Sequence, residues 1–243
     1  MIQVINRALN ILEYLAKNQE TRKNLKDIST EFNLNAGTCA NILKTLITRK
    51  YVVKSEKRDY ALGPMAYSLT GSGNYRMDLV NTANSELDKL TKKWNENSLI
   101  AIIEEDLRIV LLSSYSINSI QASTESHKKA YNTAVGRILL AKLNEDELKR
   151  FIAMYGLPTF EQWPEVKGDE KVLQQLLSKC NKLGFATIVN SEEIIAFAAP
   201  VMRNSMAVAG IGIYIPTFRF KKSSQNELIN DLMAACKAVG EKL

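Results

Sequence analysis

The sequence predicts an α+β protein with two domains, on three observations. Its 243 residues, 46% of them apolar, suffice for one or two domains of roughly 150 residues each. Residues 1–63 hold 11 Lys and Arg against 6 Asp and Glu, whereas the other 180 residues hold 21 against 20. Near residue 50 the apolar spacing changes from a helical period to alternation. We expect a basic domain at 1–63, linker helices at 64–96 and a second domain at 97–243.

The composition excludes several classes of protein. No apolar run reaches the roughly 18 residues of a membrane span, and the densest one, 194–202, contains Pro200. The first twenty residues lack the basic start and apolar run of a signal peptide, so we expect a cytoplasmic protein. Three separated cysteines and one histidine, His127 in an expected solvated loop, favour neither a disulfide framework nor a metal site. We expect no cofactor.

The basic N-terminal segment has a distinctive order of elements. Apolar residues at helical spacing predict helices over 4–16, 25–32 and 37–50, with a tight break before the third. Alternation then predicts two short strands, 51–54 and 60–62, joined by a basic turn. Three helices followed by a basic hairpin are typical of a winged helix-turn-helix.

The outward face of the third helix is the candidate DNA-binding surface. It carries small hydrogen-bonding side chains and one lysine but no carboxylate, which suits a face that enters a DNA groove beside phosphates. Asn35 is the expected N-cap of this helix. With the basic hairpin, the candidate residues are Asn35, Gly37, Thr38, Asn41, Lys44, Thr45, Arg49, Lys54, Lys57 and Arg58.

The rest of the chain mixes strands and helices, which predicts an α+β domain with an antiparallel sheet. A helix over 75–96 carries an apolar stripe that could pack on its own domain or form a dimer seam. The other expected strands are 98–104, 108–115, 185–190, 194–202 and 207–215, and the other expected helices are 134–143, 146–155, 169–183 and 223–242.

A candidate ligand site precedes the helix at 134–143. Residues Tyr131 to Gly136 lead into that helix, whose first N–H groups and positive dipole end could bind a small carboxylate. An ordinary capped helix is the alternative for the same residues.

The segments NRALNILEYLAKN, LKDISTEFNLNAGTCANILKTLITRKYV and YALG resemble the DNA-binding domain of the isocitrate-lyase-regulator (IclR) family of bacterial transcription factors. TAVGRILLAKLNEDEL, GFATIVNSEE and AFAAPV continue the resemblance in the family's order. It implies a GAF-like effector-sensing C-terminal domain, and a regulator, with repression expected, of a metabolic operon. It also implies a homodimer or homotetramer on a palindromic double-stranded DNA operator, controlled by a small metabolite.

This chain differs from the usual pattern of the family it resembles in the recognition helix and in the effector site. The recognition helix usually begins with a Ser-Thr pair and carries an Arg one turn later, where this chain has Gly37-Thr38 and Asn41. Asn reads adenine where Arg reads guanine, so a different operator is expected. The implied effector site, with most of the family's polar side chains missing, comprises Tyr131, Thr133, Ala134, Val135, Gly136, Glu192, Ala196, Gly212 and Tyr214.

Two other functions stay open beside an effector-controlled regulator. The second domain could serve only for dimerisation, which would make the protein an effector-independent DNA binder. An enzyme would need a nucleophile, an acid–base pair or a metal set. The adjacent carboxylates Glu104-Glu105 and Glu192-Glu193 would point to opposite faces of a strand, and no GxxxxGK[ST] phosphate loop occurs. We therefore expect no enzymatic activity.

Overall fold

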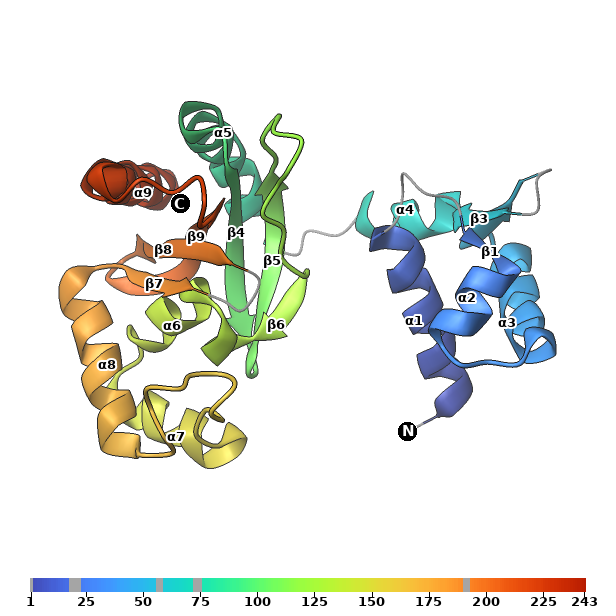
Figure 1. Cartoon of the computed structure of the whole chain (residues 1–243), viewed down its shortest axis with the longest axis horizontal. Helices are drawn as coiled ribbons and strands as arrows, with labels where there is room; N and C mark the ends of the chain where they lie inside the picture. Colours follow the sequence, from blue (N-terminus) through green and yellow to red (C-terminus); the bar gives the residue numbers. More distant parts are fainter. Residues whose placement is uncertain (1, 18–22, 56–58, 72–75, 190–192) are drawn as a thin grey trace. The chain divides into compact units, whose positions relative to one another are not determined.

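The computed structural model describes residues 2–17, 23–55, 59–71, 76–189 and 193–243. The chain divides into two compact units, residues 1–75 and 76–243, and each is described by itself (Figure 1). In the described part of the chain, no helix has the length and apolar character needed to cross a membrane.

The first unit is a small helical domain with a three-stranded sheet. Apolar side chains from its three leading helices and from β2 and β3 form one core, which includes Ile11, Ile28, Leu43 and Val52. The strand order is β1-β3-β2 and both pairings are antiparallel. The elements are α1 (Gln3–Lys17), β1 (Lys23–Asn24), α2 (Leu25–Glu31), α3 (Ala36–Thr48), β2 (Val52–Lys54), β3 (Asp59–Leu62) and α4 (Pro64–Gly71).

The predicted winged helix-turn-helix is confirmed, with one added strand. β1, a two-residue strand that pairs with β3, was not predicted from the sequence. Its second residue, Asn24, also begins α2 through a capping box with Asp27. So short a segment carries no alternation pattern, and therefore only the pairing partner reveals it.

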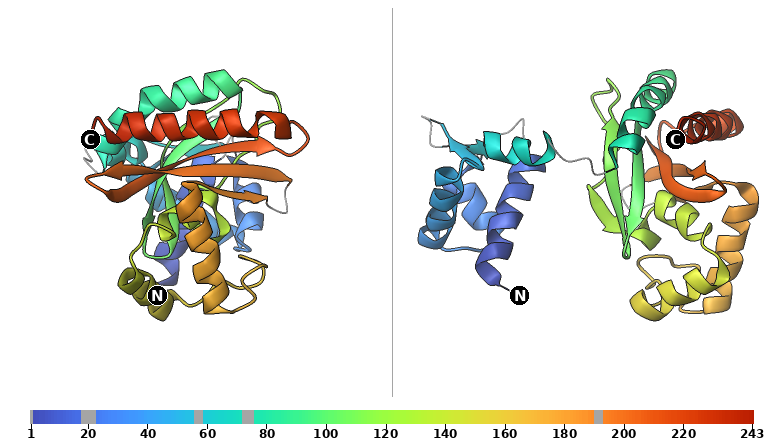
Figure 2. Two further views of the ribbon diagram at one scale, coloured as in Figure 1. Left: turned by 90° about the vertical axis from the view of Figure 1, so that its left-hand side faces the viewer. Right: turned by 180° about the vertical axis from the view of Figure 1, so that it is seen from behind.

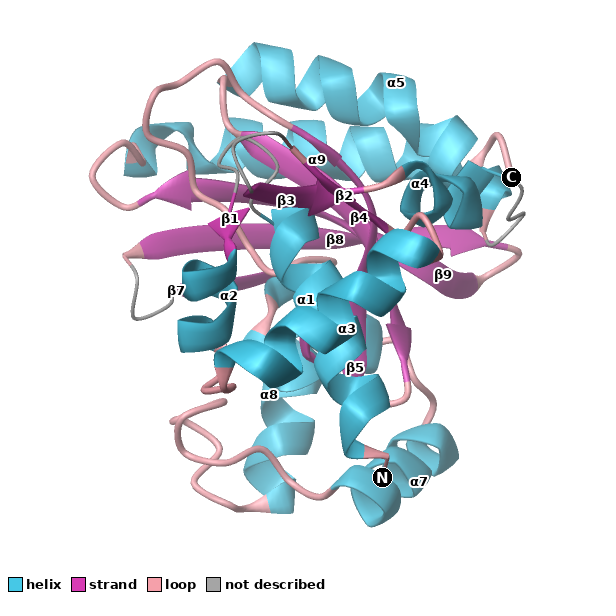
Figure 3. Ribbon diagram, turned by 90° about the vertical axis from the view of Figure 1, so that its right-hand side faces the viewer, coloured by secondary structure: helices cyan, strands magenta, loops and turns pink. Residues whose placement is uncertain are grey.

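The second unit is built on a six-stranded antiparallel sheet with the order β6-β5-β4-β9-β8-β7. Helices α5 and α9 lie side by side on one face of the sheet, and α6 and α8 lie on the other (Figures 2 and 3). The strands are β4 (Asn97–Glu104), β5 (Leu107–Ser114), β6 (His127–Lys129), β7 (Ala186–Val189), β8 (Ile194–Arg203) and β9 (Met206–Pro216). The helices are α5 (Met77–Trp94), α6 (Ala134–Leu140), α7 (Glu145–Tyr155), α8 (Glu170–Leu183) and α9 (Gln225–Gly240).

The apolar stripe of α5 packs within its own unit. Ala83, Leu87 and Leu90 are buried in the core layer that α5 forms with α9 and the sheet. This stripe is therefore not a seam for another chain. The segment 64–96, expected to hold linker helices, divides between the units, because α4 falls in the first and α5 in the second.

The polar stretch before α6 corrects one expectation. His127 was expected in a solvated loop, but it begins β6 and pairs with Ile109 of β5. Its side chain is exposed, and the ring Nδ1 lies 3.3 Å from the Ser126 hydroxyl. The short strand forms backbone hydrogen bonds with β5. A polar stretch without alternating apolar residues gives no sign of this pairing in the sequence.

Candidate nucleic-acid interface and effector pocket

Helix α3 presents two different faces. Its start is fixed by Asn35, whose side-chain oxygen accepts a hydrogen bond of 2.7 Å from the Thr38 backbone N–H, which confirms the predicted N-cap. Residues on the inner face, Cys39, Ile42, Leu43 and Leu46, are buried in the core. On the outer face Gly37, Asn41, Lys44, Thr45 and Arg49 are exposed, while Thr38 is half-buried.

The outer face of α3 combines neutral hydrogen-bonding side chains with two positively charged ones, Lys44 and Arg49. Thr45 donates its hydroxyl proton to the Asn41 carbonyl at 3.1 Å, so its oxygen lone pairs face outward as acceptors. From Glu31 to Glu56 the sequence has no acidic residue between the two. Lys44 and Arg49 form no salt bridge within the described residues. This surface can therefore approach a polyanion without carboxylate repulsion.

The hairpin adds one described cation beside this face. Lys54 of β2 is exposed, and its ammonium lies 5.6 Å from the centre of the Tyr60 ring on β3, within cation–π distance. Lys57 and Arg58, predicted at the tip of the hairpin, lie outside the described residues.

The start of α6 does not provide the open anion site that the sequence suggested. Thr133 caps the helix by accepting a hydrogen bond of 2.9 Å from the Gly136 N–H. Residues 133–136 are all buried, and a Cβ on Gly136 would lie 2.0 Å from the Ala130 carbonyl oxygen. The structure therefore has the ordinary capped helix, because close packing against the preceding turn uses these residues as core.

The predicted effector residues lie in different places. Tyr131 packs against Phe151 with ring centres 5.7 Å apart, and its hydroxyl donates to the Gly156 carbonyl at 3.2 Å. Ala134 and Val135 belong to the core, and Gly212 lies in β9 where a Cβ would stand 3.2 Å from the Tyr214 ring. Glu192 falls outside the described residues.

Three of the predicted residues, Thr133, Ala196 and Tyr214, line one small cavity. Its volume of about 20 Å³ is enough for one water molecule. The described residues that line it are Ser123, Thr124, Lys128, Asn132, Thr133, Ile188, Ile194, Ala196 and Tyr214.

Sequence reasoning missed a fully buried cation beside this cavity. The Arg108 side chain has no exposed surface. Its Nη2 donates to the hydroxyl of Thr124 at 2.8 Å, and its Nη1 donates to the Glu125 carbonyl at 2.9 Å. Arg108 stands at the start of the apolar segment RIVLL, and a charge within an expected strand of apolar residues is the signal that could have found it.

Burial acts on the ionisation of Arg108 and of Tyr214. Loss of water around the guanidinium lowers the pKa of Arg108 below its ordinary value. Burial raises the pKa of the Tyr214 phenol, and the positive charge of Arg108 offsets part of that rise. Tyr214 therefore keeps its proton at neutral pH and can donate a hydrogen bond to an anion.

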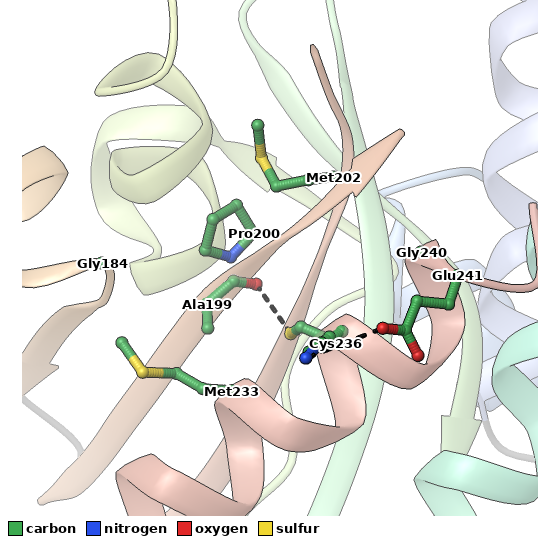
Figure 4. Close-up of a pocket in the computed structure, with 9 residues that line it drawn as sticks. Gly184, Ala199, Pro200, Met202, Met233, Cys236, Gly240 and Glu241 are labelled. Carbon is green, nitrogen blue, oxygen red and sulfur yellow. Dashed lines mark hydrogen bonds and ion pairs between the residues drawn. The ribbon is translucent and has the colours of Figure 1, made fainter. Parts of the chain in front are cut away.

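A larger groove lies between β8 and α9 (Figure 4). It encloses about 440 Å³ and is lined mainly by apolar groups, including Met202, Met233 and Cys236. The Cys236 thiol donates to the Ala199 carbonyl at 3.3 Å, and burial raises the pKa of this thiol to about 12. The thiol therefore stays protonated and is a poor nucleophile.

The described residues contain no group of three His, Cys, Asp or Glu side chains that could hold a metal ion.

The IclR helix-turn-helix domain matches residues 4–56, and the C-terminal domain of the bacterial transcriptional regulator IclR matches residues 74–241. The chain belongs to the IclR family. The two-domain α+β architecture predicted from the sequence is the architecture of this family.

Relatives within the family match over the whole chain. The HTH-type transcriptional regulator KdgR of Escherichia coli is 21% identical over 248 residues, which cover 100% of this chain and 93% of KdgR. The Thermotoga maritima IclR crystal structure has a TM-score of 0.75 at 20% identity and covers 100% of this chain and 99% of its own. An IclR homolog from Microbacterium hydrocarbonoxydans, complexed with 4-hydroxybenzoate, has a TM-score of 0.75 at 15% identity over 99% of both chains.

Proposed function

We propose that this protein is a cytoplasmic transcriptional regulator that represses a metabolic operon by binding a palindromic operator. The observation that carries the proposal is the outer face of α3, which is exposed and free of carboxylates. In this proposal residues 1–63 bind DNA, and 97–243 sense a ligand and form the oligomer. Of the segment between them, α4 belongs to the first unit and α5 to the second. The protein has no catalytic role.

Contacts to bases and to phosphates fall to different residues in this proposal. Asn41 and Lys44 reach base edges in the major groove, and Thr38 and Thr45 contribute shorter contacts beside them. Arg49, Lys54, Lys57 and Arg58 contact phosphates, together with the backbone at Gly37. Phosphate contacts set the affinity and the register, whereas the Asn41 amide sets the preference for adenine.

An apolar face on α1 supports a homodimer. Val4, Ile5 and Leu9 of α1 are 56%, 51% and 50% exposed, and none of them belongs to the core of the first unit. Contiguous exposed apolar side chains mark surfaces that another protein covers. A second copy that covers this face would present two copies of α3 related by a twofold axis, which suits a palindromic operator and permits a tetramer through the second unit.

The small cavity of the second unit bears on the choice between two kinds of regulator. The Microbacterium homolog was solved in complex with 4-hydroxybenzoate, which supports a small-molecule effector, and we propose a small carboxylate that binds in the second domain. The volume of about 20 Å³ favours the alternative, an effector-independent DNA binder, because no metabolite fits the cavity without rearrangement. A panel of metabolites separates the two, since an effector changes both the melting temperature and the operator affinity.

Fragmented genomic DNA tests the proposal directly in a mobility-shift assay. We expect a discrete complex with a subset of fragments at about 50 mM salt, which excess unrelated DNA does not displace. Binding to every fragment with equal affinity, or to none, would contradict a site-specific regulator.

A further inference from the structure

The small cavity of the second unit is surrounded by unused hydrogen-bonding atoms. Among the described residues, four buried side-chain atoms have no hydrogen-bond partner, and two of them, Tyr214 Oη and Asn132 Oδ1, belong to residues that line this cavity. A third, Nε of Arg108, belongs to the side chain that donates to Thr124 in the cavity wall. Buried polar atoms are nearly always bonded, so a cluster of exceptions indicates a missing partner.

Two cations, Lys128 and Arg108, lie at or beside this cavity. Lys128 lines the cavity and lies directly opposite Arg108 in the pairing of β5 with β6, so the two side chains share one face of the sheet. No acidic residue is among the described residues that line the cavity, and neither cation forms a salt bridge within that part of the chain. Arg108 and Lys128 repel each other, and the buried Arg108 has lost its hydration. A bound anion would offset both the repulsion and the lost hydration.

We propose that this cavity binds a short 2-hydroxycarboxylate, a class of ligand that deepens the effector site of the proposed function and rests on it. The carboxylate accepts hydrogen bonds from the Lys128 ammonium and from the Tyr214 hydroxyl. The ligand hydroxyl donates to Asn132 Oδ1, which needs a donor. Arg108 stands behind Thr124 and acts as a positioning residue, since its charge favours an anion and its hydrogen bonds hold residues 124–125 in place.

The cavity must enlarge to admit this ligand. About 20 Å³ holds one water molecule, and a three-carbon acid needs several times that volume. Lys128 is only half-buried and Ser123 is exposed, so this side of the wall can move outward without disturbing the core. The ligand therefore binds an expanded form better than the closed one, and this difference in affinity is what lets a ligand shift an equilibrium between states.

Calorimetric titration of the full chain with three probes tests the proposal. Lactate carries both groups, acetate carries only the carboxylate, and 1,2-propanediol carries only hydroxyls. We expect lactate to bind at least tenfold more tightly than acetate, and propanediol not to bind. Asn132→Ala should bring lactate down to the level of acetate. Lys128→Met should weaken both acids at least tenfold, whereas Lys92→Met, which removes an exposed lysine on α5, should leave both unchanged.

Tyr214→Phe provides a test that loss of folding cannot imitate. The hydroxyl has no hydrogen-bond partner among the described residues, so its removal should not lower the melting temperature, yet lactate binding should fall at least tenfold. The proposal is overturned if this variant melts earlier than the wild type, if lactate does not bind, or if Lys128→Met and Lys92→Met behave alike. A mobility shift on the same samples separates the outcomes, since intact operator binding without lactate binding rejects only the cavity assignment.

Discussion

Helices α3 and α6 begin in the same way and are used differently. Each has a capping side chain that accepts a hydrogen bond from the backbone N–H three residues on, at 2.7 Å from Asn35 and 2.9 Å from Thr133. Each has a glycine soon after the cap. In α3 that glycine is exposed and the helix presents an open outer face, whereas in α6 the residues from the cap to the glycine are buried.

A helix start becomes a binding site only where the fold leaves it open. Gly37 has nothing closer to its missing Cβ than the Asn35 side chain at 3.5 Å. A Cβ on Gly136 would lie 2.0 Å from the Ala130 carbonyl oxygen. The Gly136 N–H donates to Thr133, so this helix start is packed and is not open to a ligand. In the second unit, three of the four buried side-chain atoms without a partner among the described residues belong to Arg108 of β5, Tyr214 of β9 and Asn132, at or beside the cavity.

The largest expected effect tests the open face of the first unit. If a dimer neutralises about six to ten phosphates, raising salt from about 50 to 200 mM should weaken operator binding about 10³–10⁵-fold, because bound counterions are released. Fluorescence anisotropy with a labelled operator measures this slope. A nearly flat response would mean that the basic surface does not face DNA.

Gly136→Ala tests the closed helix start. The added Cβ would collide with the Ala130 carbonyl oxygen. A backbone atom cannot relieve the clash by rotating away, as a flexible side chain could. We expect a loss of about 3–5 kcal/mol in the free energy of unfolding, seen in denaturant unfolding of the full chain. Wild-type stability in this variant would show that the start of α6 has room for a ligand after all.

These two helix starts also show how far sequence reasoning reaches. The face of α3 could be predicted, because burial of Ile42, Leu43 and Leu46 follows from local periodicity and leaves the rest outward. Of the cavity, the family resemblance implied Thr133, Ala196 and Tyr214. Arg108 and Lys128 were not expected, because only the register of β5 with β6 brings these two cations together. The helix-start motif was visible in sequence, but what packs on it was not.

Asn41→Ala separates base reading from phosphate binding on the open face. Loss of a two-hydrogen-bond contact to adenine should cost about 1–3 kcal/mol on the preferred operator and much less on one mutated at that base pair. Lys54→Ala, at an exposed cation of the hairpin, is the matched control and should weaken both operators about equally. If both variants weaken matched and mismatched operators alike, α3 does not read bases through this residue.

Gly37→Ala is the counterpart of the glycine change in α6 and should have the smallest effect. The site has room for a methyl group, and alanine favours a helix over glycine by about 0.5–1 kcal/mol. The first unit should therefore become slightly more stable in thermal unfolding. A destabilised variant would mean that Gly37 is held in a conformation that alanine cannot share.

If two copies of α3 read a twofold-symmetric DNA site, selection of random double-stranded DNA on the purified protein, followed by sequencing, should show that symmetry. We predict an inverted repeat in the sequences enriched by the wild type, and for Asn41→Ala the same repeat without its preference at one base pair in each half-site. An enriched pool with no common motif, or a motif that Asn41→Ala leaves unchanged at every position, would contradict the account.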